Sequence, residues 1–125
     1  MSKVYFTKEH EWVKVTGAEG VVGITDYAQH ALGDVVFVEL PAIGRTLTRG
    51  GEAAVVESVK AASEVFSPVT GDVLTINAQI VDQPGLINDS PEDSAWFFSV
   101  RLTDPSELDD LMDRAAYDAF VKGLE

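Results

Sequence analysis

The sequence predicts a mainly β fold, a barrel-like sandwich of antiparallel sheets with a short internal helix and C-terminal helices. The first observation is that short runs rich in β-branched and aromatic residues recur over the first hundred residues, with glycine, proline or polar breaks between them. The second is that apolar residues recur at helical spacing after residue 103. A chain of 125 residues is expected to form a single domain. We expect the sandwich over about residues 3–103 and the helical segment over about 104–125.

The first half of the chain combines short strands with one helix. Thr25 can cap a helix and Gly33 can end it, and Ala28, Ala31 and Leu32 between them share one face. A short helix is therefore predicted over residues 25–33. The strands expected on either side of this helix cover residues 4–6, 11–15, 21–24 and 34–40.

A hairpin is predicted around Lys60. Two β-prone runs meet at this lysine, and neither glycine nor proline separates them. Residues 67–71, with the sequence Ser-Pro-Val-Thr-Gly, then close the segment with strong turn chemistry. Lys60 is therefore expected at or near the tip of a rigid hairpin, where a modifying enzyme can reach it and attach a covalent arm. The alternative interpretation is an ordinary solvated lysine.

Two more strands are expected over residues 72–80 and 95–102, and the chain then becomes helical. Asp104 can cap this segment, Pro105 suits the first helical position, and Glu107 is an acid three residues after the cap. Two apolar stripes of helical period follow, and we expect both to pack against the sandwich. The first consists of Leu108, Leu111 and Met112, and the second of Tyr117, Phe120, Val121 and Leu124.

The composition excludes several classes of function. There is no cysteine, which rules out disulfides, thiolate zinc sites and catalysis by a protein thiol. The 21 acidic against 9 basic residues give a formal charge of −12, so neither nucleic acid nor an anionic membrane is an expected partner. No apolar run is long enough to span a membrane, and no signal or transit pattern opens the chain. We expect a monomeric cytoplasmic protein, or the mature form of a mitochondrial one.

The residues around Lys60 resemble the swinging-arm hairpin that lipoyl and biotinyl domains of the hammerhead type share. Biotinyl domains carry methionine on both sides of their lysine, where this chain has Val59 and Ala61. Acyltransferase lipoyl domains usually have aspartate before the lysine. Val59 at that place, with Glu57 three residues before Lys60, is instead similar to the H protein of the glycine cleavage system. Further blocks that recur in H proteins are residues 10–12, 23–25, 32–34, 38–41, 77, 84–88 and 96.

The resemblance implies a carrier protein and not an enzyme. It implies lipoate in amide linkage on Lys60, which carries the aminomethyl group of glycine. The implied partners are the glycine decarboxylase (P protein), the aminomethyltransferase (T protein), the dihydrolipoyl dehydrogenase (L protein) and a lipoylating enzyme. The same resemblance assigns recognition by the lipoylating enzyme or a partner to Glu57, Ser58, Val59 and Ala61, and an acidic cleft for the loaded arm to Glu11 and Glu64.

Three other functions differ in how well the residues agree with them. A biotinyl carrier subunit is disfavoured by Val59 and Ala61, whereas an H-like protein that relays lipoate to other enzymes stays open. An independent hydrolase or transferase lacks a Gly-x-Ser-x-Gly sequence, a phosphate-binding loop and a catalytic triad pattern.

The two histidines give no metal-ligand spacing. Some family members have a cleft histidine at the place of Ala31, and His30 lies one position earlier. One residue along a helix turns the side chain by about 100°, so His30 is not expected to replace it. His10 is expected to have a structural role.

Overall fold

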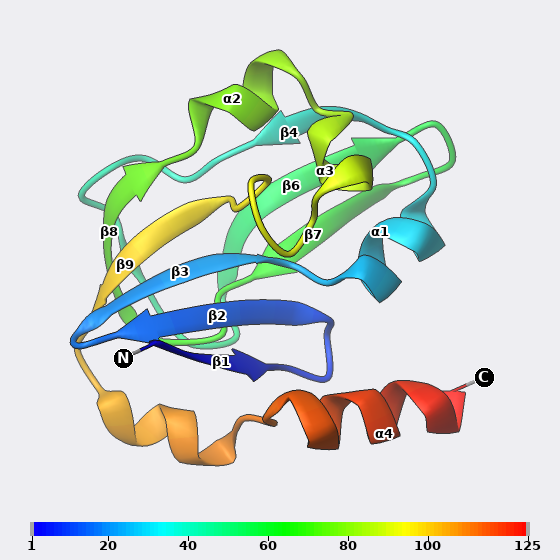
Figure 1. Ribbon diagram of the computed structural model, residues 1–125. Coiled ribbons are helices and arrows are strands. Elements are labelled where there is room, and N and C mark those ends of the chain that lie inside the picture. Colours follow the sequence, from blue (N-terminus) through cyan, green and yellow to red (C-terminus); the bar gives the residue numbers. More distant parts are fainter. Residues whose placement is uncertain (1, 125) are drawn as a thin grey trace.

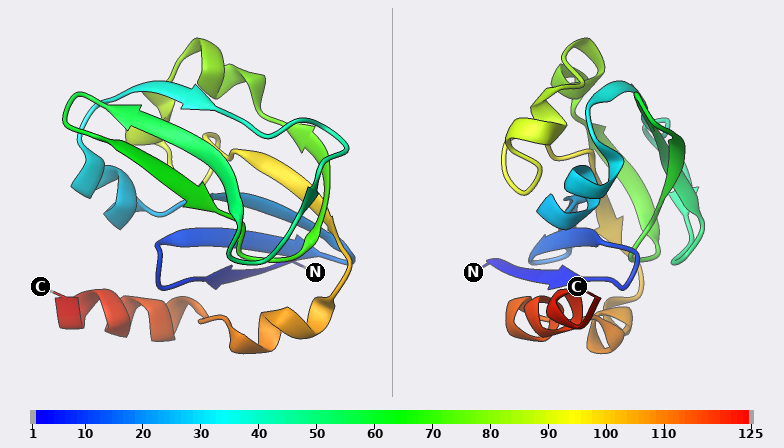
Figure 2. Two further views of the ribbon diagram at one scale, coloured as in Figure 1. Left: turned by 180° about the vertical axis from the view of Figure 1, so that it is seen from behind. Right: turned by 90° about the vertical axis from the view of Figure 1, so that its right-hand side faces the viewer.

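The computed structural model describes residues 2–124 and contains two antiparallel sheets that pack against each other, which confirms the predicted sandwich (Figure 1). Sheet A has the strand order β1-β2-β3-β9-β8-β5, and sheet B the order β4-β6-β7. The strands of sheet A are β1 (Ser2–Phe6), β2 (Glu11–Thr16), β3 (Glu19–Ile24), β5 (Thr46–Leu47), β8 (Gly71–Ile76) and β9 (Phe98–Leu102). Those of sheet B are β4 (Val35–Glu39), β6 (Glu52–Ser58) and β7 (Ala62–Phe66). Figure 2 shows the two layers from behind and from the side.

Short helices cover the edges of the sandwich. They are α1 (Asp26–Leu32), α2 (Ala78–Asp82), α3 (Leu86–Asp89), the 3₁₀ segment η1 (Pro105–Asp110) and α4 (Arg114–Leu124). The predicted cap of α1 is confirmed, because the Thr25 hydroxyl accepts a hydrogen bond from the Ala28 N–H. Gly33 ends this helix with a φ of 81°. No helix among residues 2–124 is long and apolar enough to cross a membrane.

The predicted strand over residues 72–80 is wrong in its last part. The side-chain oxygen of Asn77 accepts a hydrogen bond from the Gln79 N–H and begins α2, so Ile80 is buried on a helix and not on a strand. The last strand begins at Phe98 and not at residue 95. Helix α3 and strand β5 were not predicted, because four and two residues are too short to show a period.

The start of the C-terminal segment also differs from the prediction in detail. Asp104 stands at the N-cap of η1, but its side chain makes no capping hydrogen bond. The carboxylate of Glu107 instead accepts hydrogen bonds from the N–H and the hydroxyl of Thr70, at 2.6 and 2.7 Å. This acid therefore connects the segment to the turn between β7 and β8 and does not close a capping box.

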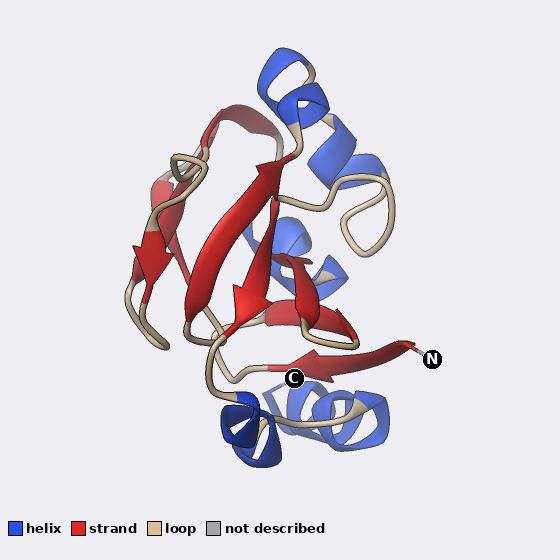
Figure 3. Ribbon diagram, turned by 90° about the vertical axis from the view of Figure 1, so that its left-hand side faces the viewer, coloured by secondary structure: helices blue, strands red, loops and turns tan. Residues whose placement is uncertain are grey.

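The C-terminal segment runs along the edge strand β1 (Figures 1 and 3). Phe6 and Met112 exchange two backbone hydrogen bonds, at 2.7 and 2.9 Å. The ring of Tyr117 stacks on Phe6 with centroids 4.7 Å apart and joins a small second core with Trp12. The second predicted stripe thus packs on the sandwich, although Leu124 at its end is half exposed. The main core fills the space between the two sheets.

Candidate functional site

Lys60 lies at the tip of the hairpin formed by β6 and β7. The strands pair as far as Glu57 and Ala62, and the Ser58 N–H donates to the Ala61 carbonyl at 2.8 Å. The Ser58 hydroxyl oxygen accepts hydrogen bonds from the N–H groups of Lys60 and Ala61, both at 3.1 Å. One serine side chain therefore fixes the turn, and Val59 and Lys60 are left exposed at its end.

The tip is anchored on the connection between α1 and β4. The Val59 N–H donates to the Asp34 carbonyl at 3.0 Å. The aliphatic part of Lys60 lies over Gly33, where a Cβ atom would come within 2.9 Å of Lys60 Cε. The Gly-Asp pair after α1 thus supports the backbone of the tip and leaves room for the lysine stem.

A groove of about 210 Å³ lies between α1 and β7. Leu32 lines this groove, and the next residue, Gly33, touches the lysine stem. We call this hollow the α1–β7 groove. Its lining comprises Glu9, His10 and Glu11 before or at the start of β2, Ile24, Tyr27, Ala28, Ala31 and Leu32 around α1, and Val56, Ser63, Glu64 and Val65 from the hairpin.

Glu11 and Glu64, both predicted for an acidic cleft, line the same groove but differ in environment. Glu64 is exposed, and partial desolvation together with the neighbouring Glu52 carboxylate raises its pKa. Glu9 is also exposed and lines the groove, and the only signal for this role was its place beside His10 and Glu11. The groove therefore offers two solvated carboxylates, those of Glu9 and Glu64.

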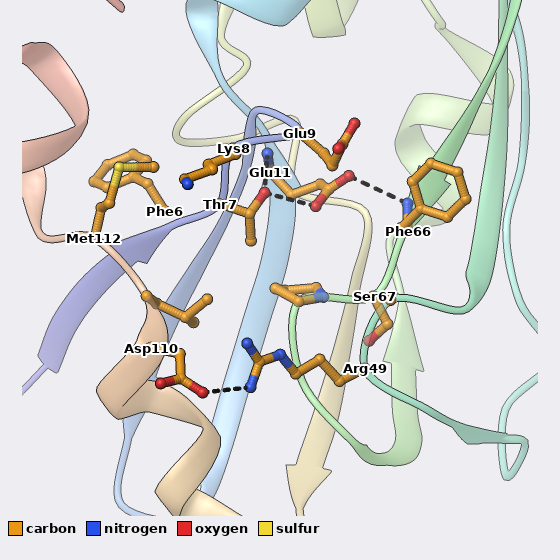
Figure 4. A pocket seen from close by; sticks show the side chains of 13 residues that line it. Phe6, Thr7, Lys8, Glu9, Glu11, Arg49, Phe66, Ser67, Asp110 and Met112 are labelled. Atoms are coloured by element: carbon orange, nitrogen blue, oxygen red, sulfur yellow. Dashed lines mark hydrogen bonds and ion pairs between the residues drawn. The ribbon is translucent and has the colours of Figure 1, made fainter. Parts of the chain in front are cut away.

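Glu11 is buried, with 3% of its surface exposed. Its carboxylate accepts hydrogen bonds from the Thr7 hydroxyl at 2.7 Å and from the Phe66 N–H at 3.3 Å, as Figure 4 shows. Because Thr7 follows β1 and Phe66 ends β7, the side chain connects sheet A to sheet B. Burial raises the pKa of Glu11 to about 7, although both hydrogen bonds act in the opposite direction.

A second cavity of about 430 Å³ lies on the other side of Glu11 (Figure 4). Its apolar lining includes Phe6, Phe66 and Met112, and an ion pair of 2.9 Å joins Arg49 to Asp110 at its edge. Glu11 lines both hollows. Glu11 thus contributes to both hollows as well as connecting the two sheets.

The histidines take different places around α1. Ala31 lines the α1–β7 groove, whereas His30 lies in a separate surface hollow beside α4, as the helical rotation predicts. His10 lines the groove, and its Nδ1 is hydrogen-bonded to the Tyr117 hydroxyl at 2.8 Å. Its ring lies 4.4 Å from that of Tyr27, and its φ is 69°. Burial lowers the pKa of His10, which favours the neutral ring.

Among residues 2–124 no three histidine or acidic side chains come together as a metal ion would require. The arrangement therefore consists of an exposed amine on a rigid tip and an adjacent groove with an acidic rim. Such a site can carry an attached group and shelter it.

The comparisons with known proteins agree on one family. Residues 4–124 match the family model described as Glycine cleavage H-protein. The chain is 64% identical to a glycine cleavage system H protein of Paramagnetospirillum magneticum and 61% identical to one of Rhodospirillum rubrum, each over the whole of both chains. It also resembles the crystal structure of a glycine cleavage system H protein from Mycobacterium marinum, with a TM-score of 0.87 at 33% identity over 96% of this chain and 97% of that one. The chain therefore belongs to the glycine cleavage H-protein family.

Proposed function

We propose that this protein is the lipoylated carrier of a glycine cleavage system, with lipoate in amide linkage to Lys60. It would receive the aminomethyl group of glycine from the glycine decarboxylase and deliver it to the aminomethyltransferase. The dihydrolipoyl dehydrogenase would then restore the disulfide. The observation that carries this proposal is the exposed Lys60 beside an acid-rimmed groove in a chain of the H-protein family.

The residues present fit an attached lipoyl group. The amine lies on an exposed turn that Ser58 holds rigid, so the attachment point is defined while the arm beyond it is free to move. When attached, lipoate supplies the sulfur chemistry, which agrees with the absence of cysteine from this chain. The role that follows for the protein is presentation and shelter, and not catalysis.

The α1–β7 groove suits a positively charged aminomethyl amine. Glu9 and Glu64 place solvated carboxylates along it, and Ala28, Ala31 and Leu32 form its apolar side. An ammonium group in such a partly desolvated groove gains from charge-assisted hydrogen bonds. We assign to Glu9 and Glu64 the electrostatic attraction of the ammonium group. To Glu11 we assign a structural role in shaping the floor of the groove.

The residues expected to be recognised by the lipoylating enzyme or a partner have two different structural roles. Glu57, Val59 and Ala61 are exposed and free to contact the lipoylating enzyme. Ser58 fixes the turn and would act on recognition through the shape of the tip. The relatives are bacterial proteins, and we propose that the chain works as a monomer in the cytoplasm with the P, T and L proteins.

Replacement of Lys60 tests the attachment site. The wild-type protein and the Lys60→Arg variant are produced in a lipoate-replete bacterial host, and their intact masses and peptide masses are measured. We expect the mass of a lipoyl amide on the Lys60 peptide of the wild type and none on the variant, because arginine offers no acyl-accepting amine. Lys122→Arg, at an exposed lysine of α4, is the matched control and should be lipoylated normally.

Two results would contradict the proposal. Lipoate on the Lys60→Arg protein would place the attachment elsewhere, and a biotinyl mass on Lys60 would favour the biotinyl carrier. The lipoylated protein is then assayed with a bacterial glycine decarboxylase for exchange of the glycine carboxyl group with labelled bicarbonate. Normal lipoylation without exchange would favour a protein that relays lipoate.

A further inference from the structure

Strand β4 carries a bulge opposite the hairpin of Lys60. Its register with β6 shifts between Val35 and Phe37, so that Val36 and Phe37 together oppose Glu57. A regular strand would alternate, and either Val36 or Phe37 would then face the core. The bulge leaves both exposed, with 56% and 46% of their surfaces accessible, while Val35 and Val38 stay buried.

This exposure is concentrated at one place. Among residues 2–124 six large apolar residues are strongly exposed, and three of them are Val36, Phe37 and Val59. Val59, with 67% of its surface accessible, is hydrogen-bonded through its N–H to Asp34, two residues before Val36. Single exposed apolar residues are ordinary, but three at neighbouring register positions form a patch. We call Val36, Phe37 and Val59 the bulge patch.

The bulge patch is continuous with the tip that presents Lys60. Val35 pairs with Ser58, and Phe37 pairs with Glu57, three residues before the lysine. Figures 1 and 2 show the tip and the beginning of β4 at the same end of the molecule. Its surroundings are acidic, since Asp34, Glu39 and Glu57 are all exposed on the same two strands or next to them.

We propose that the bulge patch is the docking surface for the enzyme that attaches the lipoyl group to Lys60. The partner surface would be an apolar pocket with a basic rim around the mouth of its active site. This inference rests on the proposed function and adds to it the surface that the attaching enzyme uses. In the reaction the neutral Lys60 amine attacks the lipoyl carbonyl of an acyl adenylate made from ATP; the C–N bond forms, AMP leaves and the amine loses one proton.

Geometry favours this enzyme over the other partners. An enzyme that forms the amide must bring its reactive carbonyl to Lys60 Nζ, so its surface has to cover the residues next to the tip. Enzymes that act on the distal dithiolane meet a long flexible arm, and they can bind farther from Lys60. The acidic rim and the formal charge of −12 also favour a basic partner over a second copy of this chain.

The test compares apolar residues of similar exposure inside and outside the bulge patch. Val36→Thr and Phe37→Thr remove apolar surface from the patch, and each places there a β-branched residue that suits a strand. Ile43→Thr and Val81→Thr are the matched controls, because Ile43 and Val81 are 64% and 45% exposed elsewhere on the molecule. Each unlipoylated protein is titrated with a purified bacterial lipoate–protein ligase, lipoate and MgATP, and lipoylation of Lys60 is followed by intact mass. Thermal unfolding verifies that each variant is folded.

We expect kcat/KM for lipoylation to fall about tenfold in each patch variant, chiefly through KM, and to stay within about twofold of wild type in the controls. The loss should persist at 0.5 M NaCl, because apolar contacts are not screened by salt. Folded patch variants lipoylated like the controls would overturn the inference and leave the proposed function intact. The inference would also be overturned if the patch variants lost activity only in the glycine decarboxylase assay. A change from dimer to monomer in sedimentation, with lipoylation unchanged, would overturn it as well. If wild-type Lys60 is not lipoylated, the proposed function itself fails.

Discussion

The stem of Lys60 lies across Gly33, so the residue that ends α1 and the residue at the tip of the hairpin share one space. A Cβ atom at residue 33 would stand 2.9 Å from Lys60 Cε and 3.6 Å from Lys60 Nζ. Gly33 also has a φ of 81° and a ψ of −159°, a backbone region that is open essentially to glycine alone. This position thus needs glycine for its backbone conformation and for the lysine above it.

Gly33→Ala should therefore destabilise the fold and displace the Lys60 side chain. The strained backbone costs about 1–3 kcal/mol, which should appear as a lower midpoint in urea unfolding with an unchanged m value. Gly123→Ala is the matched control: its Cβ would meet nothing within 4 Å, and alanine favours a helix such as α4. Equal stability of the Gly33→Ala and wild-type proteins would show that the end of α1 adapts without strain.

Ser58→Ala should loosen the hairpin tip without unfolding the protein. The change removes the acceptor for the N–H groups of Lys60 and Ala61 and a donor to the Ala61 carbonyl, at a cost of about 1 kcal/mol. Hydrogen exchange of these two amides should become faster, while that of core strands such as β9 changes little. Ser106→Ala, in η1 at the other end of the molecule, is the control. Unchanged protection at residues 60 and 61 would mean that backbone pairing alone holds the turn.

Much of the fold could be predicted from the sequence because its signals are local. Short runs of β-branched and aromatic residues predict β2, β4 and the Lys60 hairpin, and Thr25 and Gly33 predict the ends of α1. The errors also have local causes. An apolar run continues through Ile80, and only the cap at Asn77 shows that the strand has ended. The two residues of β5 carry no readable period, and their pairing with β8 depends on tertiary structure.

The candidate site could be predicted in part. The position of Lys60 follows from the hairpin pattern, and the exclusion of His30 from the groove follows from helical geometry. The burial of Glu11 could not be predicted, because it depends on Thr7 before β2 and on Phe66 of the other sheet. The bulge at Val36 and Phe37 could not be predicted either, since both residues fit a regular strand.

Tyr117→Phe should destabilise the contact between α4 and the sandwich. The Tyr117 hydroxyl is hydrogen-bonded to His10 Nδ1 at 2.8 Å and to Thr25 Oγ1 at 2.7 Å, and the residue is 3% exposed. Its removal leaves both partners short of one hydrogen bond, at a cost of about 1–2 kcal/mol in urea unfolding. Tyr5→Phe, at a half-buried residue for which no side-chain hydrogen bond is found in residues 2–124, should change stability by less than about 0.5 kcal/mol. Equal losses of unfolding free energy in the two variants would mean that the hydrogen bonds of Tyr117 to His10 and Thr25 do not contribute to stability.

The buried carboxyl group of Glu11 should make stability depend on pH. Its pKa is about 7 in the folded protein, above its ordinary value of 4.5, because burial disfavours the charged form. The folded state therefore holds the proton more tightly than the unfolded state does. The tighter binding of the proton stabilises the folded state, and this stabilisation is fully present below pH 4.5 and is lost as the pH rises through about 7. The shift corresponds to about 3 kcal/mol in total, of which about 2 kcal/mol falls between pH 5.5 and 8.5.

Glu11→Gln isolates this effect, because glutamine has a similar shape and does not titrate. Only one oxygen remains to accept a hydrogen bond, so the variant should be less stable than wild type at pH 5.5, where Glu11 is protonated and retains both contacts with Thr7 and Phe66. Between pH 5.5 and pH 8.5 the free energy of unfolding of the wild type falls by about 2 kcal/mol relative to that of the variant. The difference in stability between the two proteins therefore narrows or reverses. Urea unfolding at half-unit pH intervals measures it, with Glu19→Gln, at an exposed residue of β3, as the control. Parallel stability curves for wild type and Glu11→Gln would show that Glu11 titrates in the folded protein as it does in the unfolded chain.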